Sequence, residues 1–86
     1  MGLDSVELVM SWEREFEIRI PNGTAAGLVT PRDAADAIAE ILQAAGRPAA
    51  REVIEEVIRT TTLDLTGLDP ADYRQDGRFM EEFGLD

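Results

Sequence analysis

The chain contains no cysteine, no histidine and no lysine. Without cysteine it can form no disulfide, thiolate nucleophile or zinc–thiolate site, and without histidine it lacks the usual general base near neutral pH. No apolar run approaches the ~18 residues of a membrane span, and the first residues lack the basic region of a signal peptide. These absences argue against an enzyme, and we expect a cytoplasmic protein.

Most of the charged residues are acidic. Eighteen acidic residues stand against eight arginines, for a formal net charge of −10. A surface this acidic repels nucleic-acid phosphates and anionic lipids, so we expect neither nucleic acid nor a membrane as a partner. Basic protein surfaces are the expected partners. The run Asp72–Gly77 superficially resembles a calcium loop, but Arg74 and Phe83 occupy its third and twelfth ligand positions, so no metal site is predicted.

Apolar residues recur at helical spacing along most of the chain, as in the stripe Leu8, Trp12 and Phe16. The chain has 86 residues, 44% of them hydrophobic, which suits one small domain. Long helices are predicted at residues 4–16, 31–45 and 49–62. Short turns are expected at 24–28 and, in helical form, at 79–83, with a loop over 63–76.

The middle helix has the clearest start and stop signals. Thr30 can cap it, Pro31 suits its first position and Asp33 its third, while Gly46 ends it. The third helix is expected to weaken at its three consecutive threonines, residues 60–62. Its predicted buried face consists of Val53, Ile54, Val57 and Ile58.

Two kinds of apolar residue are expected in the first helix. Trp12 falls in the apolar stripe and is predicted to be a core residue. Val6 and Met10 lie off the stripe and flank Glu7 and Glu13. Exposed apolar side chains beside carboxylates favour a surface that binds a protein partner.

Several segments together resemble acyl carrier proteins, in a permuted order. Val6-Glu7-Leu8-Val9-Met10 and the following residues to Pro21 resemble that family's second helix and the loop after it. Residues 29–34 resemble the opening of its last helix. Residues 51–86, ending in Phe79-Met80-Glu81-Glu82-Phe83-Gly84-Leu85-Asp86, resemble its first helix and the loop before the serine that carries 4'-phosphopantetheine.

The resemblance implies a circularly permuted, all-α, acyl-carrier-like four-helix bundle with three long helices and one short. In this reading residues 1–86 form a single domain, in which 1–46 correspond to family helices two to four and 47–86 to helix one. We expect a monomer, because the helix ends joined by residues 44–48 should already be close.

Two registers place the family's modified serine differently. Taken at face value, Gly2-Leu3-Asp4-Ser5 assigns the prosthetic arm to Ser5, but the helix from there to Phe16 is then about one turn too short. The gapless register, which we prefer, puts Gly2 at the serine position with Asp86 as the residue before it. Glycine has no hydroxyl to modify, and Ser5 would then serve as a helix cap.

Three functions remain open at this point. The first is a non-catalytic module without a prosthetic arm that docks to enzymes of fatty-acid or polyketide-type acyl metabolism. The second is a working carrier with 4'-phosphopantetheine placed on Ser5 by a phosphopantetheinyl transferase, and the third is a helical oligomerisation domain that keeps only the fold. In the first, the residues that face a basic enzyme surface are Asp4, Val6, Glu7, Met10 and Glu13.

Overall fold

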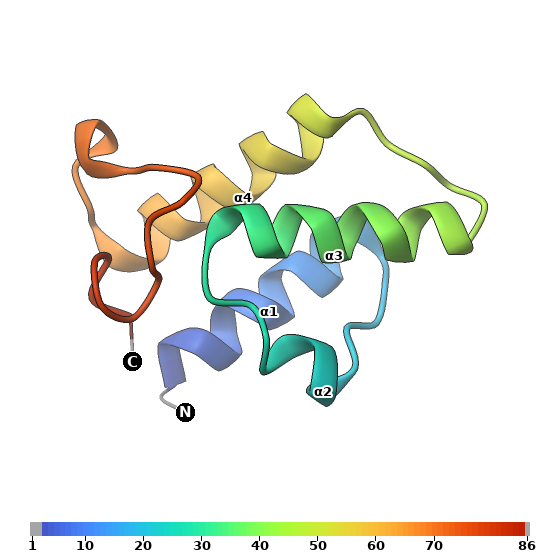
Figure 1. Cartoon of the computed structure of the whole chain (residues 1–86), viewed down its shortest axis with the longest axis horizontal. Helices are drawn as coiled ribbons and strands as arrows, with labels where there is room; N and C mark the ends of the chain where they lie inside the picture. Colours follow the sequence, from blue (N-terminus) through green and yellow to red (C-terminus); the bar gives the residue numbers. More distant parts are fainter. Residues whose placement is uncertain (1–2, 86) are drawn as a thin grey trace.

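Helices make up all the regular structure of the described chain (Figure 1). The computed structural model describes residues 3–85, with the backbone alone at residues 3 and 4. In this part lie three long helices and one short one, with no strand, so the predicted all-α, four-helix fold is confirmed. None of these helices is long and apolar enough to cross a membrane. The elements are α1 (Leu3–Phe16), α2 (Asn22–Ala25), α3 (Pro31–Ala44), α4 (Arg51–Thr66) and a 3-10 turn, Pro70–Asp72.

Helix α3 begins as the sequence predicts. The Thr30 hydroxyl accepts a hydrogen bond from the Asp33 N–H at 3.2 Å, and the Asp33 carboxylate accepts one from the Thr30 N–H at 3.1 Å. This reciprocal arrangement is a capping box, with Pro31 at the start of the helix. After Ala44 the chain leaves the helix, and Gly46 adopts a left-handed φ of 73° that suits glycine.

Helix α4 is shifted along the chain relative to the prediction, starting at Arg51 and running four residues beyond the expected end to Thr66. Its threonines do not end it, because tertiary contacts outweigh their low helix propensity, and the Thr61 hydroxyl accepts a hydrogen bond from the Trp12 Nε1 of α1. Thr62 and Thr66 each donate to the carbonyl oxygen four residues earlier, both at 2.7 Å, and Thr62 is fully buried. The helix instead ends at Gly67, whose φ is 71°.

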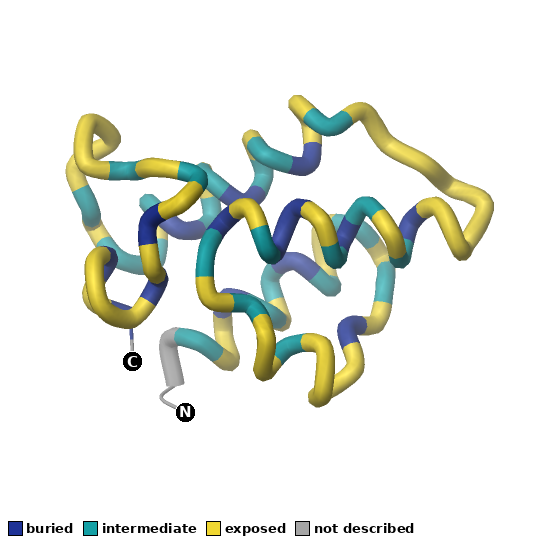
Figure 2. Tube along the Cα trace, viewed as in Figure 1, coloured by how far each residue is buried: buried dark blue, intermediate teal, exposed yellow. Residues whose placement is uncertain are grey.

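The core forms where α4 packs against α1 and α3 (Figure 2). Trp12 is 1% exposed, which confirms its predicted place in the core. The predicted buried face of α4 is wrong at Val53, which is 53% exposed, because one residue before Ile54 is a rotation of about 100° around the helix. The buried residues of the long helices are Leu8, Trp12, Pro31, Ala34, Ala35, Ile38, Leu42, Ile54, Ile58 and Thr62.

The short helix α2 leads into the predicted turn at 24–28. It begins at Asn22, directly after Pro21, whose carbonyl oxygen accepts from the Ala25 N–H at 2.9 Å. The turn itself follows, with the Gly27 and Leu28 N–H groups bonded to Thr24 and Ala25. A single helical turn therefore connects α1 to the segment that enters α3.

Residues 74–85, which we call the strap, cross one end of the molecule without forming a helix (Figure 1). The predicted helical turn at 79–83 is present as one isolated turn. The N–H groups of Glu82 and Phe83 both converge on the Arg78 carbonyl oxygen, at 2.9 and 3.1 Å, and Gly84 then turns the chain with a φ of 75°. The strap is nevertheless part of the core, because Phe79, Phe83 and Leu85 are at most 5% exposed.

Replacing Gly77 with alanine is expected to destabilise the strap. A Cβ at this buried position would lie 2.3 Å from the Cζ atom of Phe83, so the ring would have to leave its site. We expect the free energy of unfolding to fall by about 1–3 kcal/mol, measured by urea titration. Gly23→Ala is the matched control, since a Cβ at Gly23 meets nothing within 4 Å. Equal stabilities of the two variants would contradict the packing of Phe83 on the strap backbone.

Candidate functional site

The outer face of α1 carries exposed apolar side chains among carboxylates. Val6 is 40% and Met10 is 51% exposed, and Glu7 beside them is exposed too. Between this face and α2 lies a shallow depression of about 150 Å³. The residues that line it are Val6, Val9, Met10, Glu13, Ile20, Asn22 and Ala25. The structure thus brings together three of the residues predicted to face a partner: Val6, Met10 and Glu13.

Glu13 also holds the backbone of the loop after α1. Its Oε2 atom accepts a hydrogen bond from the Ile20 N–H at 2.8 Å, and its side chain is half-buried. Ile20 itself is buried, so this bond fixes a core residue that follows α1 by four positions. Sequence reasoning assigned Glu13 to a partner surface and missed this role, because a pairing seven residues apart has no periodic signature.

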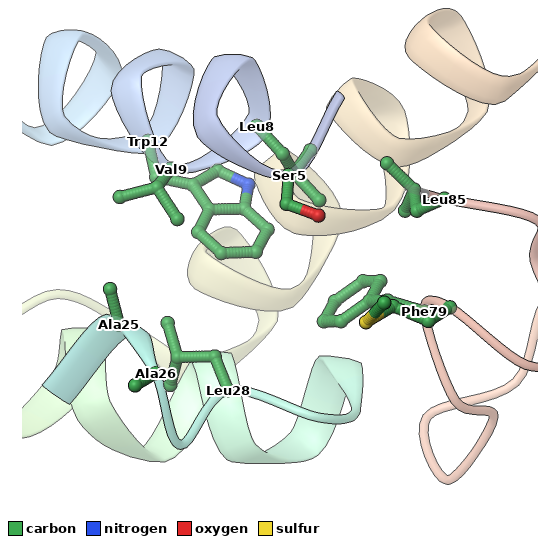
Figure 3. A pocket seen from close by; sticks show the side chains of 10 residues that line it. Ser5, Leu8, Val9, Trp12, Ala25, Ala26, Leu28, Phe79 and Leu85 are labelled. Atoms are coloured by element: carbon green, nitrogen blue, oxygen red, sulfur yellow. The ribbon is translucent and has the colours of Figure 1, made fainter. Parts of the chain in front are cut away.

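A larger cavity of about 330 Å³ lies between α1, α2 and the strap (Figure 3). Its lining residues are apolar except Ser5, and they come from all three segments and from the loop after α2. Trp12 forms part of its wall, and the indole is held in place by a 2.8 Å hydrogen bond from Nε1 to the Thr61 hydroxyl of α4. The lining residues are Ser5, Leu8, Val9, Trp12, Ala25, Ala26, Leu28, Phe79, Met80 and Leu85.

Ser5 lines this cavity and is not part of the exposed outer face of α1. It lies in the first turn of α1, is half-buried, and lines the cavity together with Leu85 from the other end of the described chain. Figure 3 shows its hydroxyl directed into the space that Trp12, Phe79 and Leu85 surround.

Some predicted positions lie outside the described residues. Gly2, the gapless match to the family's serine, is one of them, as is Asp86. Asp4 is described only as backbone within the first turn of α1. The candidate site therefore consists of the outer face of α1 with Val6, Glu7, Met10 and Glu13, and of the cavity behind it with Ser5.

Part of the chain has a curated relative. An acyl carrier protein from Picosynechococcus sp. is 50% identical over 39 residues, which are 45% of this chain and 48% of that protein. Over that stretch the chain is similar to an acyl carrier protein. It spans about half the length of the curated relative that it matches. No family model and no solved structure matches the chain.

Proposed function

We infer that the chain is an acyl-carrier-like, non-catalytic docking module without a prosthetic arm, which binds a basic surface on enzymes of acyl metabolism. The observation that carries this inference is the outer face of α1, where Val6 and Met10 are 40% and 51% exposed next to the exposed Glu7. The partial similarity to an acyl carrier protein supports a carrier-like role in place of an enzyme.

The composition of this face suits a basic partner. Two exposed apolar side chains offer surface that gains free energy when it is removed from water. The surrounding carboxylates, in a chain of net charge −10, attract a positively charged surface and orient its approach. Together they favour a small interface with apolar contacts at its centre and ion pairs around them.

The absence of an arm is supported by the environment of Ser5. Transfer of phosphopantetheine needs a serine hydroxyl that the transferase can reach at a helix start. Ser5 is half-buried and lines the apolar cavity, with its hydroxyl turned inward (Figure 3). The preferred sequence register, in which Gly2 stands at the serine position, agrees with this environment.

A permuted segment order is part of the same proposal. Ser5 and Leu85, close to the two ends of the described chain, line one cavity. Joining these ends and opening residues 45–50, the connection between α3 and α4, would restore the order of helices seen in acyl carrier proteins. Such proximity of chain ends is what a permuted domain requires.

The working carrier is the second candidate, and one observation favours it. Ser5 lies in the first turn of a helix, beside an apolar cavity with room for a hydrocarbon chain. In this alternative the chain would carry 4'-phosphopantetheine on Ser5. The two candidates differ in whether a transferase modifies the chain, while both can use the outer face of α1 for docking.

Docking is tested by binding to a purified β-ketoacyl synthase of bacterial fatty-acid synthesis, followed by fluorescence anisotropy. Affinity is expected to fall as NaCl rises from about 0.05 to about 0.5 M, because salt screens exposed charge pairs. Glu7→Lys should weaken binding by about tenfold, equivalent to ~1.4 kcal/mol. Glu7 is the better probe because Glu13 also holds Ile20.

Glu40→Lys is the matched control, because it makes the same charge change at an exposed position of α3. It should leave most of the affinity intact. Equal losses for the two variants would mean that only net charge matters, and binding without salt dependence would exclude the acidic face as the contact. If neither binding nor modification by a transferase occurs, the oligomerisation domain becomes the better interpretation.

A further inference from the structure

The chain contains a single asparagine, Asn22, and a glycine follows it. This pair is prone to lose the side-chain amide, because glycine has no Cβ to keep its backbone nitrogen away from the asparagine Cγ. Asn22 and Gly23 are both exposed, in the short helix α2 at the surface of the molecule (Figure 2). Asn22 also lines the depression between α1 and α2, together with Met10 and Glu13.

The backbone around Asn22 is held by few hydrogen bonds. The Ala25 N–H donates to the Pro21 carbonyl oxygen at 2.9 Å, and the Ala26 N–H donates to the Asn22 carbonyl oxygen at 3.0 Å. The Gly23 N–H has no hydrogen-bond acceptor within residues 3–85. A single helical turn held in this way opens locally at low free energy, and the opening lets the Asn22 side chain turn toward the Gly23 nitrogen.

A second pair in the chain shows the opposite arrangement. Asp76 precedes Gly77 in the strap, and aspartate before glycine can cyclise by the same route. Gly77 is buried, however, and its N–H donates to the Arg74 carbonyl oxygen at 3.1 Å. The Asp76 carboxylate is paired with Arg32 at 3.0 Å. The fold therefore restrains the pair in the strap and leaves the pair in α2 free to react.

We propose that Asn22 is a site of spontaneous deamidation, and that the carboxylate formed there strengthens the docking face. The Gly23 backbone nitrogen loses its proton and bonds to Cγ of Asn22, while the side-chain nitrogen leaves as ammonia. Water then opens the resulting succinimide ring to give aspartate or isoaspartate. Both products carry one additional negative charge, and water is the only reagent consumed.

The effect on binding rests on the docking function proposed above. The new carboxylate would stand at the depression that Met10 and Glu13 also line, beside the exposed apolar residues of α1. A further negative charge at this place raises the attraction for a basic surface. The chemical step itself does not depend on docking, so the two parts of the proposal have separate measurements.

Deamidation is measured by intact mass after incubation of the full chain at mildly alkaline pH. The mass should rise by about 1 Da, and peptide mapping should place the change at Asn22. The rate in the folded chain should lie within about tenfold of the rate in urea, because α2 opens locally. Isoaspartate at Asp76 should instead form more than about tenfold more slowly in the folded chain than in urea.

Gly23→Ala is the matched variant for the chemical step. Its methyl group hinders the approach of the backbone nitrogen, so deamidation in the folded chain should slow by at least about tenfold. The fold should persist, since a Cβ at Gly23 meets nothing within 4 Å. A folded chain that deamidates more than about tenfold more slowly than in urea would overturn the site. So would equal slowing of the two glycine pairs, or an unchanged rate in Gly23→Ala.

The effect on docking is measured with Asn22→Asp and the same β-ketoacyl synthase. Affinity should rise by about two- to threefold at low salt, and the gain should disappear at about 0.5 M NaCl. Gln43→Glu is the control, because it makes the same charge change at an exposed position of α3 outside the depression, and it should leave the affinity unchanged.

The two proposals fail in distinguishable ways. If Asn22→Asp does not tighten binding while Glu7→Lys still weakens it, the docking function stands and the effect of deamidation on it is overturned. If neither variant changes the affinity, the docking function and this effect fail together. The mass measurement decides in either case whether Asn22 is the site of modification.

Discussion

Ile54→Ala is expected to lower the free energy of unfolding by on the order of 2–5 kcal/mol. Ile54 is fully buried in α4, the helix that packs against both α1 and α3, so truncating it leaves a cavity in the core. Small domains have total stabilities of about 5–15 kcal/mol, so the loss would remove a large fraction of the free energy of unfolding. Urea titration followed by circular dichroism measures the change.

Val53→Ala is the control for this experiment, because the neighbouring residue on the same helix is 53% exposed. Its effect should stay within about 0.5 kcal/mol. Leu8→Ala tests the same core from α1, since Leu8 is 3% exposed, and should also fall in the range of about 2–5 kcal/mol. If Val53→Ala and Ile54→Ala destabilise equally, the orientation of α4 described above is incorrect.

The second prediction is that a phosphopantetheinyl transferase does not modify the wild-type chain. Incubation of the wild-type chain with coenzyme A and a broad-specificity phosphopantetheinyl transferase is expected to leave its intact mass unchanged. The half-buried Ser5 turns its hydroxyl toward the cavity, and Gly2 has no hydroxyl. Intact-mass spectrometry distinguishes the modified from the unmodified chain completely, so the result is a yes or a no.

An ordinary bacterial acyl carrier protein, treated in parallel, shows that the transferase is active. Ser5→Ala shows whether any modification depends on that residue. A mass increase on the wild-type chain that disappears in Ser5→Ala would establish the working carrier and exclude the arm-less module. A mass increase that persists in Ser5→Ala would mean that a different hydroxyl group of the chain is modified.

The sequence predicts those parts of the fold that depend on neighbours along the chain. The stripe through Leu8 and Trp12 predicts α1 and its buried side, and Thr30 with Asp33 predicts the first turn of α3. The residues of each signal lie three or four positions apart, about one helical turn, so each signal can be recognised without knowing what packs against it. The exposure of Val6 and Met10 is confirmed for the same reason.

The parts that could not be predicted depend on tertiary contacts. Low helix propensity suggested an early end to α4, but Thr62 is buried by packing and bonds to its own helix. Phe79 and Phe83 have the spacing of one helical turn, but the burial that leaves each only 5% exposed depends on how the strap packs. Ser5 and Leu85 are eighty positions apart in sequence, yet they line one cavity, which no local pattern indicates.

The bond from the Ile20 N–H to Glu13 gives one carboxylate two possible partners. A carboxylate oxygen accepts more than one hydrogen bond, so an arginine or lysine of the proposed docking partner can bind Glu13 while the Ile20 N–H stays in place. The bond to Ile20 already fixes the Glu13 side chain, so less conformational entropy is lost when such an ion pair forms. In the proposed docking surface, Glu13 is therefore a contact that the protein's own loop orders in advance.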